Sequence, residues 1–166
     1  MKEIKNTTIY TRDIVKDFLE IYYFEKVKVV RAILNIFIAI IIITFITKDK
    51  RSTLDIITFI FALFGILEIN TSMLPRLNLY KLEKKKDSIL NTKVTYIFKK
   101  NNFSLNNKEY IDYNTLKKVI ETDKTYYLYL DKSRALIVDK SLLNDEDINT
   151  LTNKLKEQVS TYKYKK

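Results

Sequence analysis

The chain has 166 residues, and its 30 Lys and Arg against 20 Asp and Glu give a net charge of +10. It contains no His and no Cys, so disulfides, thiolate metal sites and His-dependent catalytic triads are excluded. The single Gly also excludes a glycine-rich phosphate-binding loop. We therefore predict a protein without enzymatic activity, with no catalytic residues, no cofactor and no metal site.

The N-terminal segment, residues 1–31, combines a short β-like stretch with an amphipathic helix. Residues 2–10 read as a strand that joins a domain formed later in the chain. Thr11 is a suitable N-cap, and Ile14, Phe18 and Tyr22 then recur every four residues, as they do on one helix face. This helix is expected either to lie on a membrane surface or to pack on the later domain.

Residues 32–69 hold two apolar runs, which we predict to be transmembrane helices over about 32–47 and 54–69. The alternative is a buried helical hairpin in a soluble core. That alternative predicts an amphipathic pattern, whereas Ile38 to Ile43 is apolar on every face. Because only six residues connect the runs, the two helices are expected to be antiparallel neighbours.

Cations surround this hairpin unequally. Nine lie close to it on the side of the two termini and three lie in the loop, which predicts cytoplasmic termini in a multi-pass protein of the cell membrane. Residues 70–90 form a basic linker in which Pro75 breaks any continuation of the second helix. The cations expected to contact lipid headgroups or to set topology are Lys28, Arg31, Arg76, Lys81, Lys84, Lys85 and Lys86.

From Asn91 the pattern changes to short β-like segments separated by turn signals. We predict six strands, over residues 93–99, 103–105, 109–113, 116–122, 126–130 and 135–139. A final helix then begins after Asn144 and carries the apolar stripe Ile148, Leu151, Leu155 and Val159. The tail 162–166 is expected to be frayed. This order is the plan of a small β-barrel with a capping helix, like that of pleckstrin-homology (PH) domains, so residues 91–166 are predicted to be a PH-like cytoplasmic domain.

Two features of the predicted domain are candidates for function. Tyr127 and Tyr129 share one face of their strand and are a possible contact patch for a partner, while Tyr126, Leu128 and Leu130 are expected in the core. The acidic stretch 121–123 is expected to be a solvated turn. Because residues 87–166 carry a net charge of only +4, nucleic acid is not predicted as a partner.

The chain also resembles a known family. The opening Tyr10-Thr11-Arg12-Asp13 with Phe18, and the order of one helix, two close spans, a Pro and a small β domain, are similar to the YcxB-like membrane proteins of bacteria. The stretches 110–113, 116–122, 126–130 and 136–140 look like the C-terminal domain of that family. Two departures stand out, since Asn-Asn replaces a glycine in the turns and 139–141 lacks the usual proline. The resemblance implies an α+β membrane protein with a PH-like domain and no catalytic signature.

These features predict a membrane-tethered binding module whose cytoplasmic domain binds protein or lipid. Two alternatives remain open at this stage. One is an immunity or self-protection protein against a membrane-active bacteriocin, and the other is a dimerising anchor or subunit of a membrane complex. The expected partners are membrane lipids and either a protein partner or a second copy of the chain.

Overall fold

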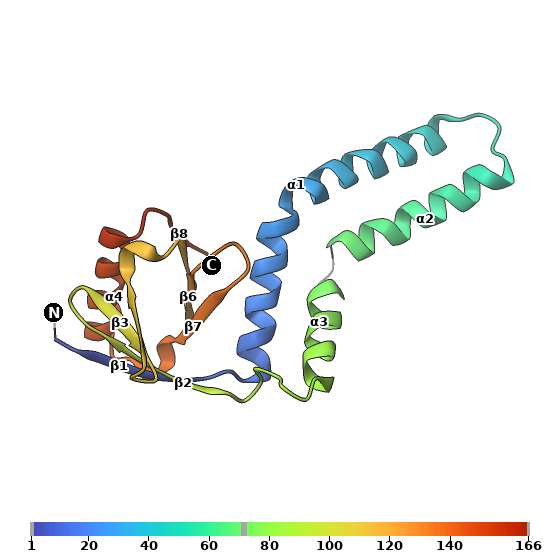
Figure 1. Cartoon of the computed structure of the whole chain (residues 1–166). Helices are drawn as coiled ribbons and strands as arrows, with labels where there is room; N and C mark the ends of the chain where they lie inside the picture. Colours follow the sequence, from blue (N-terminus) through green and yellow to red (C-terminus); the bar gives the residue numbers. More distant parts are fainter. Residues whose placement is uncertain (1, 71–72, 166) are drawn as a thin grey trace. The chain divides into compact units, whose positions relative to one another are not determined.

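The computed structural model describes residues 2–70 and 73–165, which divide into two compact units. The first unit combines Met1–Phe18 with Asp87–Lys166, and the second is Leu19–Lys86. The first unit is therefore built from both ends of the chain, while the second is the segment between them (Figure 1).

The first unit begins with an antiparallel sheet in the order β1-β2-β3-β4. Strand β1 (Ile4–Ile9) pairs with β2 (Lys93–Phe98), so the strand predicted near the N-terminus does join the later domain, as the blue and yellow-green arrows of Figure 1 show. The register pairs Ile4 with Phe98 and Ile9 with Lys93. Strands β3 (Asn102–Leu105) and β4 (Glu109–Asp112) complete the sheet.

The second sheet of this unit has the order β7-β6-β5-β8. Strands β5 (Lys118–Glu121), β6 (Thr125–Tyr129) and β7 (Ala135–Asp139) are antiparallel, and β8 (Tyr162–Tyr164) runs parallel to β5. The tail that was expected to be frayed thus forms an edge strand up to Tyr164. Short 3-10 helices η1 (Tyr113–Thr115) and η2 (Lys140–Leu142) lead into β5 and away from β7.

Asparagine takes the left-handed backbone positions in the described part of the first unit, which has no glycine. Asn91, Asn106 and Asn107 have φ angles of 61°, 50° and 58°, in the left-handed region that asparagine tolerates better than most residues. Two successive positive φ angles at Asn106 and Asn107 match the twist of the hairpin that connects β3 to β4.

Helix α4 (Asp145–Gln158) closes the core. Asn144 caps it by accepting a hydrogen bond of 2.8 Å from the Asp147 amide, as predicted. Leu151, Leu155 and Val159 of the predicted stripe are buried, and Ile148 is partly buried. They pack in one core with aromatic and aliphatic side chains from both sheets, including Tyr96, Phe98, Phe103, Tyr113, Tyr126 and Leu128.

Backbone hydrogen bonds do not close the two sheets into one barrel, in contrast to a closed PH-like barrel. Side chains of β1 and of the residue after it instead bond the edge of β7. The Asn6 amide donates to the Asp139 carbonyl at 2.7 Å, and the Thr8 hydroxyl accepts from the Asp139 amide at 2.9 Å. The Tyr10 hydroxyl accepts from the Ile137 amide at 3.3 Å. These bonds give hydrogen-bond partners to backbone groups of β7 that would otherwise be buried without any.

The second unit consists of helices. Helix α1 (Arg12–Thr47) starts in the first unit and runs without a break through the predicted amphipathic segment and the first apolar run. Helix α2 (Thr53–Asn70) holds the second apolar run, and α3 (Met73–Lys84) carries Pro75 in its first turn, where a missing N–H costs little. Of the helices in the described residues, α1 is long and apolar enough to cross a membrane, and α2 is apolar but shorter.

Helices α1 and α2 contact each other through a few side chains. The rings of Phe45 and Phe59 stack with centroids 4.2 Å apart. Ile38 and Ala62 are buried, and a Cβ atom at Gly65 would lie 3.3 Å from Ile38 Cδ1. The remaining large apolar side chains of both helices are mostly exposed.

Candidate functional site

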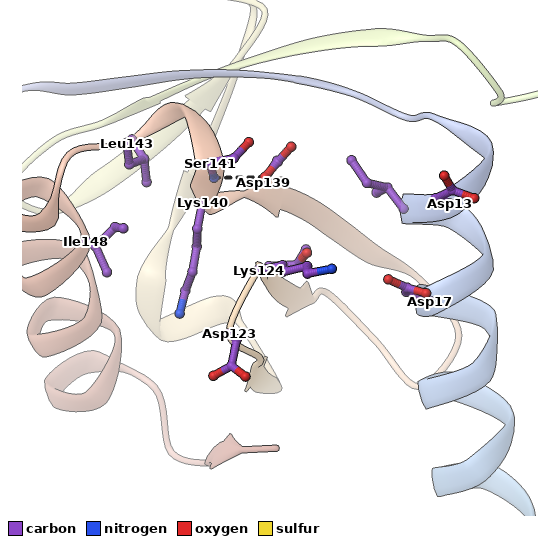
Figure 2. Close-up of a pocket in the computed structure, with 11 residues that line it drawn as sticks. Asp13, Asp17, Asp123, Lys124, Asp139, Lys140, Ser141, Leu143 and Ile148 are labelled. Atoms are coloured by element: carbon purple, nitrogen blue, oxygen red, sulfur yellow. Dashed lines mark hydrogen bonds between the residues drawn. The ribbon is translucent and has the colours of Figure 1, made fainter. Parts of the chain in front are cut away.

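A groove of about 550 Å³ lies in the first unit (Figure 2). Its walls come from the first turns of α1, the turn between β5 and β6, and the segment from the end of β7 to the start of α4. The lining residues are Asp13, Ile14, Asp17, Asp123, Lys124, Thr125, Asp139, Lys140, Ser141, Leu143 and Ile148.

Local hydrogen bonds hold the polar rim of this groove in place. In the β5–β6 turn, the Thr125 amide donates to the Thr122 hydroxyl at 3.0 Å, and the Thr122 amide donates to the Thr125 carbonyl at 2.8 Å. This turn leaves Asp123 and Lys124 exposed at the rim. At the end of β7, the Asp139 carboxylate accepts from the Ser141 amide at 2.9 Å and begins η2.

Beside the groove lies a buried ion pair between Glu121 and Lys140, each only 7% exposed. The Lys140 ammonium also donates to the Thr122 carbonyl at 2.8 Å and lies 4.5 Å from the centre of the Tyr126 ring. The second oxygen of Glu121 accepts a hydrogen bond from Tyr162. Glu121 was expected in a solvated turn, and that expectation is wrong, because Lys140 and β8 enclose it.

Burial raises the pKa values of the neighbouring tyrosines. It raises the pKa of Tyr126 to about 12, although a hydrogen bond with Thr152 acts in the opposite direction. Burial also raises the pKa of Tyr162, and its bond to Glu121 adds to that rise. Both hydroxyls are therefore neutral donors at physiological pH, and Tyr162 connects the C-terminal strand to the ion pair.

Most of the charged side chains that line the groove are acidic. Four carboxylates line it, and Lys140 is already paired with Glu121, which leaves Lys124 as an exposed cation at the rim. Across the described parts of the chain, no three His, Cys, Asp or Glu side chains are grouped closely enough to hold a metal ion. An anionic rim of this kind favours contact with cationic or hydrogen-bond-donating groups.

The tyrosine pair proposed as a contact patch is covered by the chain itself. Tyr127 is 1% exposed and Tyr129 is 3% exposed. The ring of Phe18, in the first turns of α1, lies 5.7 Å from that of Tyr127 and 6.4 Å from that of Tyr129. Lys118 adds a cation 4.5 Å from the Tyr129 ring. The start of α1 thus occupies this face of β6, which agrees with packing on the domain.

The predicted lipid-contact cations lie on the helices of the second unit. Lys28 and Arg31 are on α1, where the Arg31 guanidinium lies 4.9 Å from the Phe24 ring. The others are exposed on α3 or directly after it: Arg76, Lys81, Lys84, Lys85 and Lys86.

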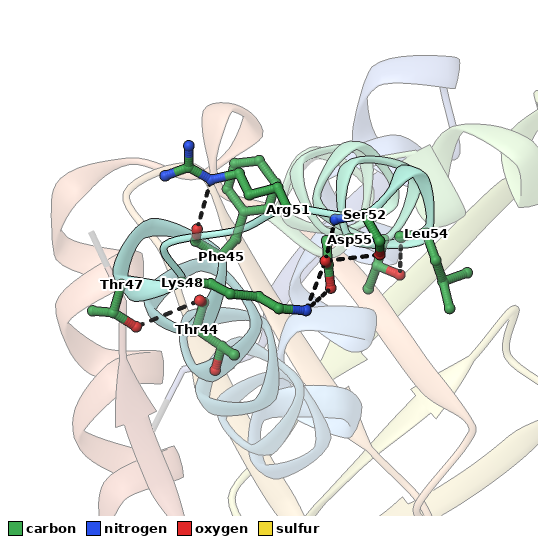
Figure 3. A network of polar contacts seen from close by, with 9 residues as sticks. Thr44, Phe45, Thr47, Lys48, Arg51, Ser52, Leu54 and Asp55 are labelled. Atoms are coloured by element: carbon green, nitrogen blue, oxygen red, sulfur yellow. Dashed lines mark hydrogen bonds and ion pairs between the residues drawn. The ribbon is translucent and has the colours of Figure 1, made fainter.

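The loop between α1 and α2 engages two of its three cations (Figure 3). The Lys48 ammonium contacts both oxygens of Asp55, at 2.7 and 2.8 Å. Arg51 donates to the carbonyls of Phe45 and Ile46, at 3.1 and 3.4 Å, which satisfies acceptors at the end of α1. Ser52 and Asp55 bond each other's backbone amides, in the manner of a capping box, at the start of α2.

The bonds from β1 to β7 were not predicted, although the sequence carries a signal for them. Ile4, Asn6, Thr8 and Tyr10 alternate at the period of a strand, and all four are buried. Two of these residues are polar, so a strand with a polar buried face could have been inferred. Their acceptors and donors on β7 are 127 to 133 residues away, which no local pattern reveals.

The structure thus defines an α+β protein with a domain assembled from both ends of the chain and an apolar helical segment between them. Residues 97–155 match the model of the family described as YcxB-like protein. The matched region runs from the end of β2 into α4 and covers just over a third of the chain, and it supports the resemblance to that family. No curated protein and no solved structure shows a significant match.

Proposed function

We propose that the protein is a two-span membrane protein whose first unit is a cytoplasmic, PH-like binding module without catalytic activity. The observation that carries this proposal is the pairing of β1 with β2 across the whole helical segment. The module would bind protein or lipid, and the helices would hold it at the membrane.

The pairing restricts how often the chain can cross a membrane. Residues 4–9 and 93–98 form one antiparallel ladder, and Tyr10 extends it through bonds of 3.0 Å to the Thr92 carbonyl and 2.9 Å from the Asn91 amide. Both strands must lie on one side of any bilayer. An open strand ladder cannot cross the hydrocarbon core, because its edge would leave backbone N–H and C=O groups without partners. The number of crossings between them is therefore even. If α1 crosses, a second crossing must return the chain, and α2 is the apolar helix available.

The exposed side chains of the second unit support the same reading. Large apolar residues project outward along both helices, among them Phe37, Ile43, Leu54, Phe61 and Leu67. A continuous apolar surface of this extent is unfavourable in water and favourable in hydrocarbon. The α2 helix of 18 residues is about 27 Å long at 1.5 Å per residue, close to the thickness of a bilayer core.

The cations support cytoplasmic termini. Nine flank the hairpin on the terminal side. Of the loop cations, Lys48 is paired with Asp55 and Arg51 covers the end of α1. A loop with these internal contacts exposes less uncompensated charge when it crosses the membrane.

Seven strands in two sheets, followed by α4, support the PH-like assignment of the first unit. Sheet β1–β4 precedes β5–β7, and the helix packs on the core that both sheets share. In this proposal the hairpin is an insertion between the first and second strands of the domain. The family match to residues 97–155 lies wholly within that domain.

Topology can be tested with single cysteines, because the chain has none. Lys50→Cys lies in the α1–α2 loop and Lys100→Cys in the β2–β3 turn. On intact cells, a membrane-impermeant maleimide should label position 50 and should label position 100 only after lysis. Equal labelling of both positions, or loss of the protein from the membrane pellet under alkaline carbonate, would contradict the proposal.

Binding can be tested in cells by photo-crosslinking from the groove. A benzoylphenylalanine at Lys124, on the groove rim, should give a discrete crosslinked product, while the same residue at Lys108, on the β3–β4 turn, serves as the matched control. A product of twice the chain mass would favour self-association. Identical patterns from positions 124 and 108 would argue against a binding role for the groove.

A further inference from the structure

We propose that α3 is an interfacial helix that lays a cationic, apolar face on an anionic bilayer surface. This inference rests on the proposed two-span topology and assigns the lipid class that the second unit would contact.

Helix α3 has two apolar faces, of which only one is covered. Pro75, Leu79 and Leu82 fall on one side of the helix at 100° per residue, and they are buried or half-buried. Leu74, Leu77 and Tyr80 lie on the other side and are 53%, 44% and 52% exposed. A helix that exposes three large apolar residues on one face needs an apolar partner for that face.

Charge identifies the partner. Lys81 and Lys84 lie on the same exposed face as Leu77, and Lys85 and Lys86 follow directly. The Lys84 ammonium lies 4.3 Å from the centre of the Tyr80 ring, so cation and aromatic surface are presented together. Anionic headgroups above acyl chains complement this combination. Two copies of the face would bring four lysines together, and that repulsion disfavours a second copy as the occupant.

The short connection between α2 and α3 limits how far the start of α3 can lie from the bilayer surface. Helix α2 ends at Asn70 and α3 begins at Met73, three Cα–Cα steps later. Steps of 3.8 Å allow at most about 11 Å between these residues. If α2 spans the hydrocarbon core, the start of α3 therefore lies in or next to the headgroup layer, which is several ångströms thick.

The test uses the full chain with one cysteine, labelled with the fluorophore NBD and reconstituted in phosphatidylcholine vesicles with or without about 30% phosphatidylglycerol. Leu77→Cys reports the exposed face, Glu83→Cys reports the other side of α3, and Ile43→Cys reports the first span. With phosphatidylglycerol present, lipid-borne nitroxides should quench position 77 about twofold more than position 83. Iodide in the aqueous phase should quench position 83 more than position 77.

The outcomes separate this inference from the topology on which it rests. If position 43 contacts lipid while position 77 is as accessible to iodide as position 83, the interfacial helix is wrong and the two-span proposal stands. If position 43 is also aqueous, both are overturned. Protection of position 77 that depends on protein concentration but not on lipid charge would show a second copy on this face and overturn the lipid assignment.

Lipid charge dependence has its own control. Replacing the four lysines of α3 and its end with Gln should remove most of the phosphatidylglycerol-dependent protection of position 77. The matched control replaces four exposed lysines of the first unit and should preserve that protection. If both sets have the same effect, the contact is not made by α3. The two sets are Lys81, Lys84, Lys85 and Lys86, and Lys100, Lys108, Lys117 and Lys132.

Discussion

The two units of this protein treat the same kind of side chain in opposite ways. In the first unit, Tyr96, Phe98 and Phe103 are fully buried between two sheets and a helix. In the second, Phe37, Phe61 and Phe64 are 61%, 71% and 61% exposed. The first unit therefore carries its own core, whereas the second leaves most of its large apolar side chains exposed. Composition averaged over the whole chain conceals this difference.

The difference also shows what holds each unit together. The first unit depends on long-range pairing and on buried polar contacts whose partners lie far apart in sequence. The second depends on local helical hydrogen bonds and a few contacts between α1 and α2, and in the proposed topology also on the lipid around it. Conditions and substitutions that disrupt side-chain packing should therefore lower the stability of the first unit more than that of the second.

The largest expected effect is the selective loss of the first unit in alkali. Burial raises the pKa of Tyr96 and Tyr113, and it raises the pKa of Tyr126 to about 12 from 10.0. A tyrosine with a raised pKa in the folded state contributes its full stability at pH values below its unfolded-state pKa of about 10. This contribution is lost as the pH rises from 10 through 12. Near-ultraviolet circular dichroism of the reconstituted chain should collapse in that range while most helical signal persists. Simultaneous loss of both signals would contradict the comparison.

The same substitution made in each unit should have very different costs. Phe98→Ala removes a fully buried ring and should destabilise the first unit by about 3–5 kcal/mol. Phe61→Ala, at a side chain that is 71% exposed, should leave the first unit unchanged and serves as the matched control. Pulse proteolysis of the reconstituted chain in urea measures the difference. Equal shifts of the unfolding midpoint for both variants would be inconsistent with a separate core in the first unit.

The buried ion pair should be the next most sensitive feature. Lys140→Met leaves the Glu121 carboxylate buried without its cation, which should cost about 3 kcal/mol. Lys124→Met, at an exposed lysine in the β5–β6 turn directly before β6, should shift stability by less than about 0.5 kcal/mol. Adding Glu121→Leu to Lys140→Met should restore part of the loss. A single variant at 140 as stable as that at 124 would show that the pair contributes little.

A charge placed on α2 tests the medium of the second unit. In water, Phe61→Asp would replace an exposed apolar ring and would be harmless. In a bilayer it should oppose insertion by about 2.5 kcal/mol and lower the membrane-embedded fraction. Carbonate extraction of cells that express each variant, with Phe61→Leu as the control, measures that fraction. An unchanged embedded fraction for Phe61→Asp would place α2 outside the membrane.

Sequence patterns predicted the features that depend on near neighbours. Alternating residues predicted β2 to β4 and β7 closely, and Asn144 with its following carboxylates predicted the start of α4. The missed features depend on distant partners. Glu121 was expected in solvent because the lysine that pairs with it lies 19 residues later in the sequence. The tail was expected to be frayed because β8 forms only by pairing with β5, about 43 residues earlier. Phe18 covers Tyr127 although more than 100 residues separate them in the sequence. The alternation of residues within β6 therefore could not reveal which face of the strand is exposed to solvent.

The smallest expected effect lies in the asparagine turn of the first unit, where two adjacent residues share a backbone conformation but differ in side-chain contacts. Asn106 and Asn107 have φ angles of 50° and 58°, so Ala at either position should cost about 1 kcal/mol. Gly relieves the backbone cost at both positions. At 106, however, the side-chain oxygen accepts a 2.9 Å bond from the Thr95 amide. Asn107→Gly should therefore be neutral or slightly stabilising, while Asn106→Gly should lose about 0.5–1 kcal/mol because that bond is removed. The urea concentration at the unfolding midpoint of the first unit, measured for both Gly variants, tests this difference in stability. If Asn106→Gly is no more damaging than Asn107→Gly, the bond from the Thr95 amide to Asn106 contributes little to the stability of the turn.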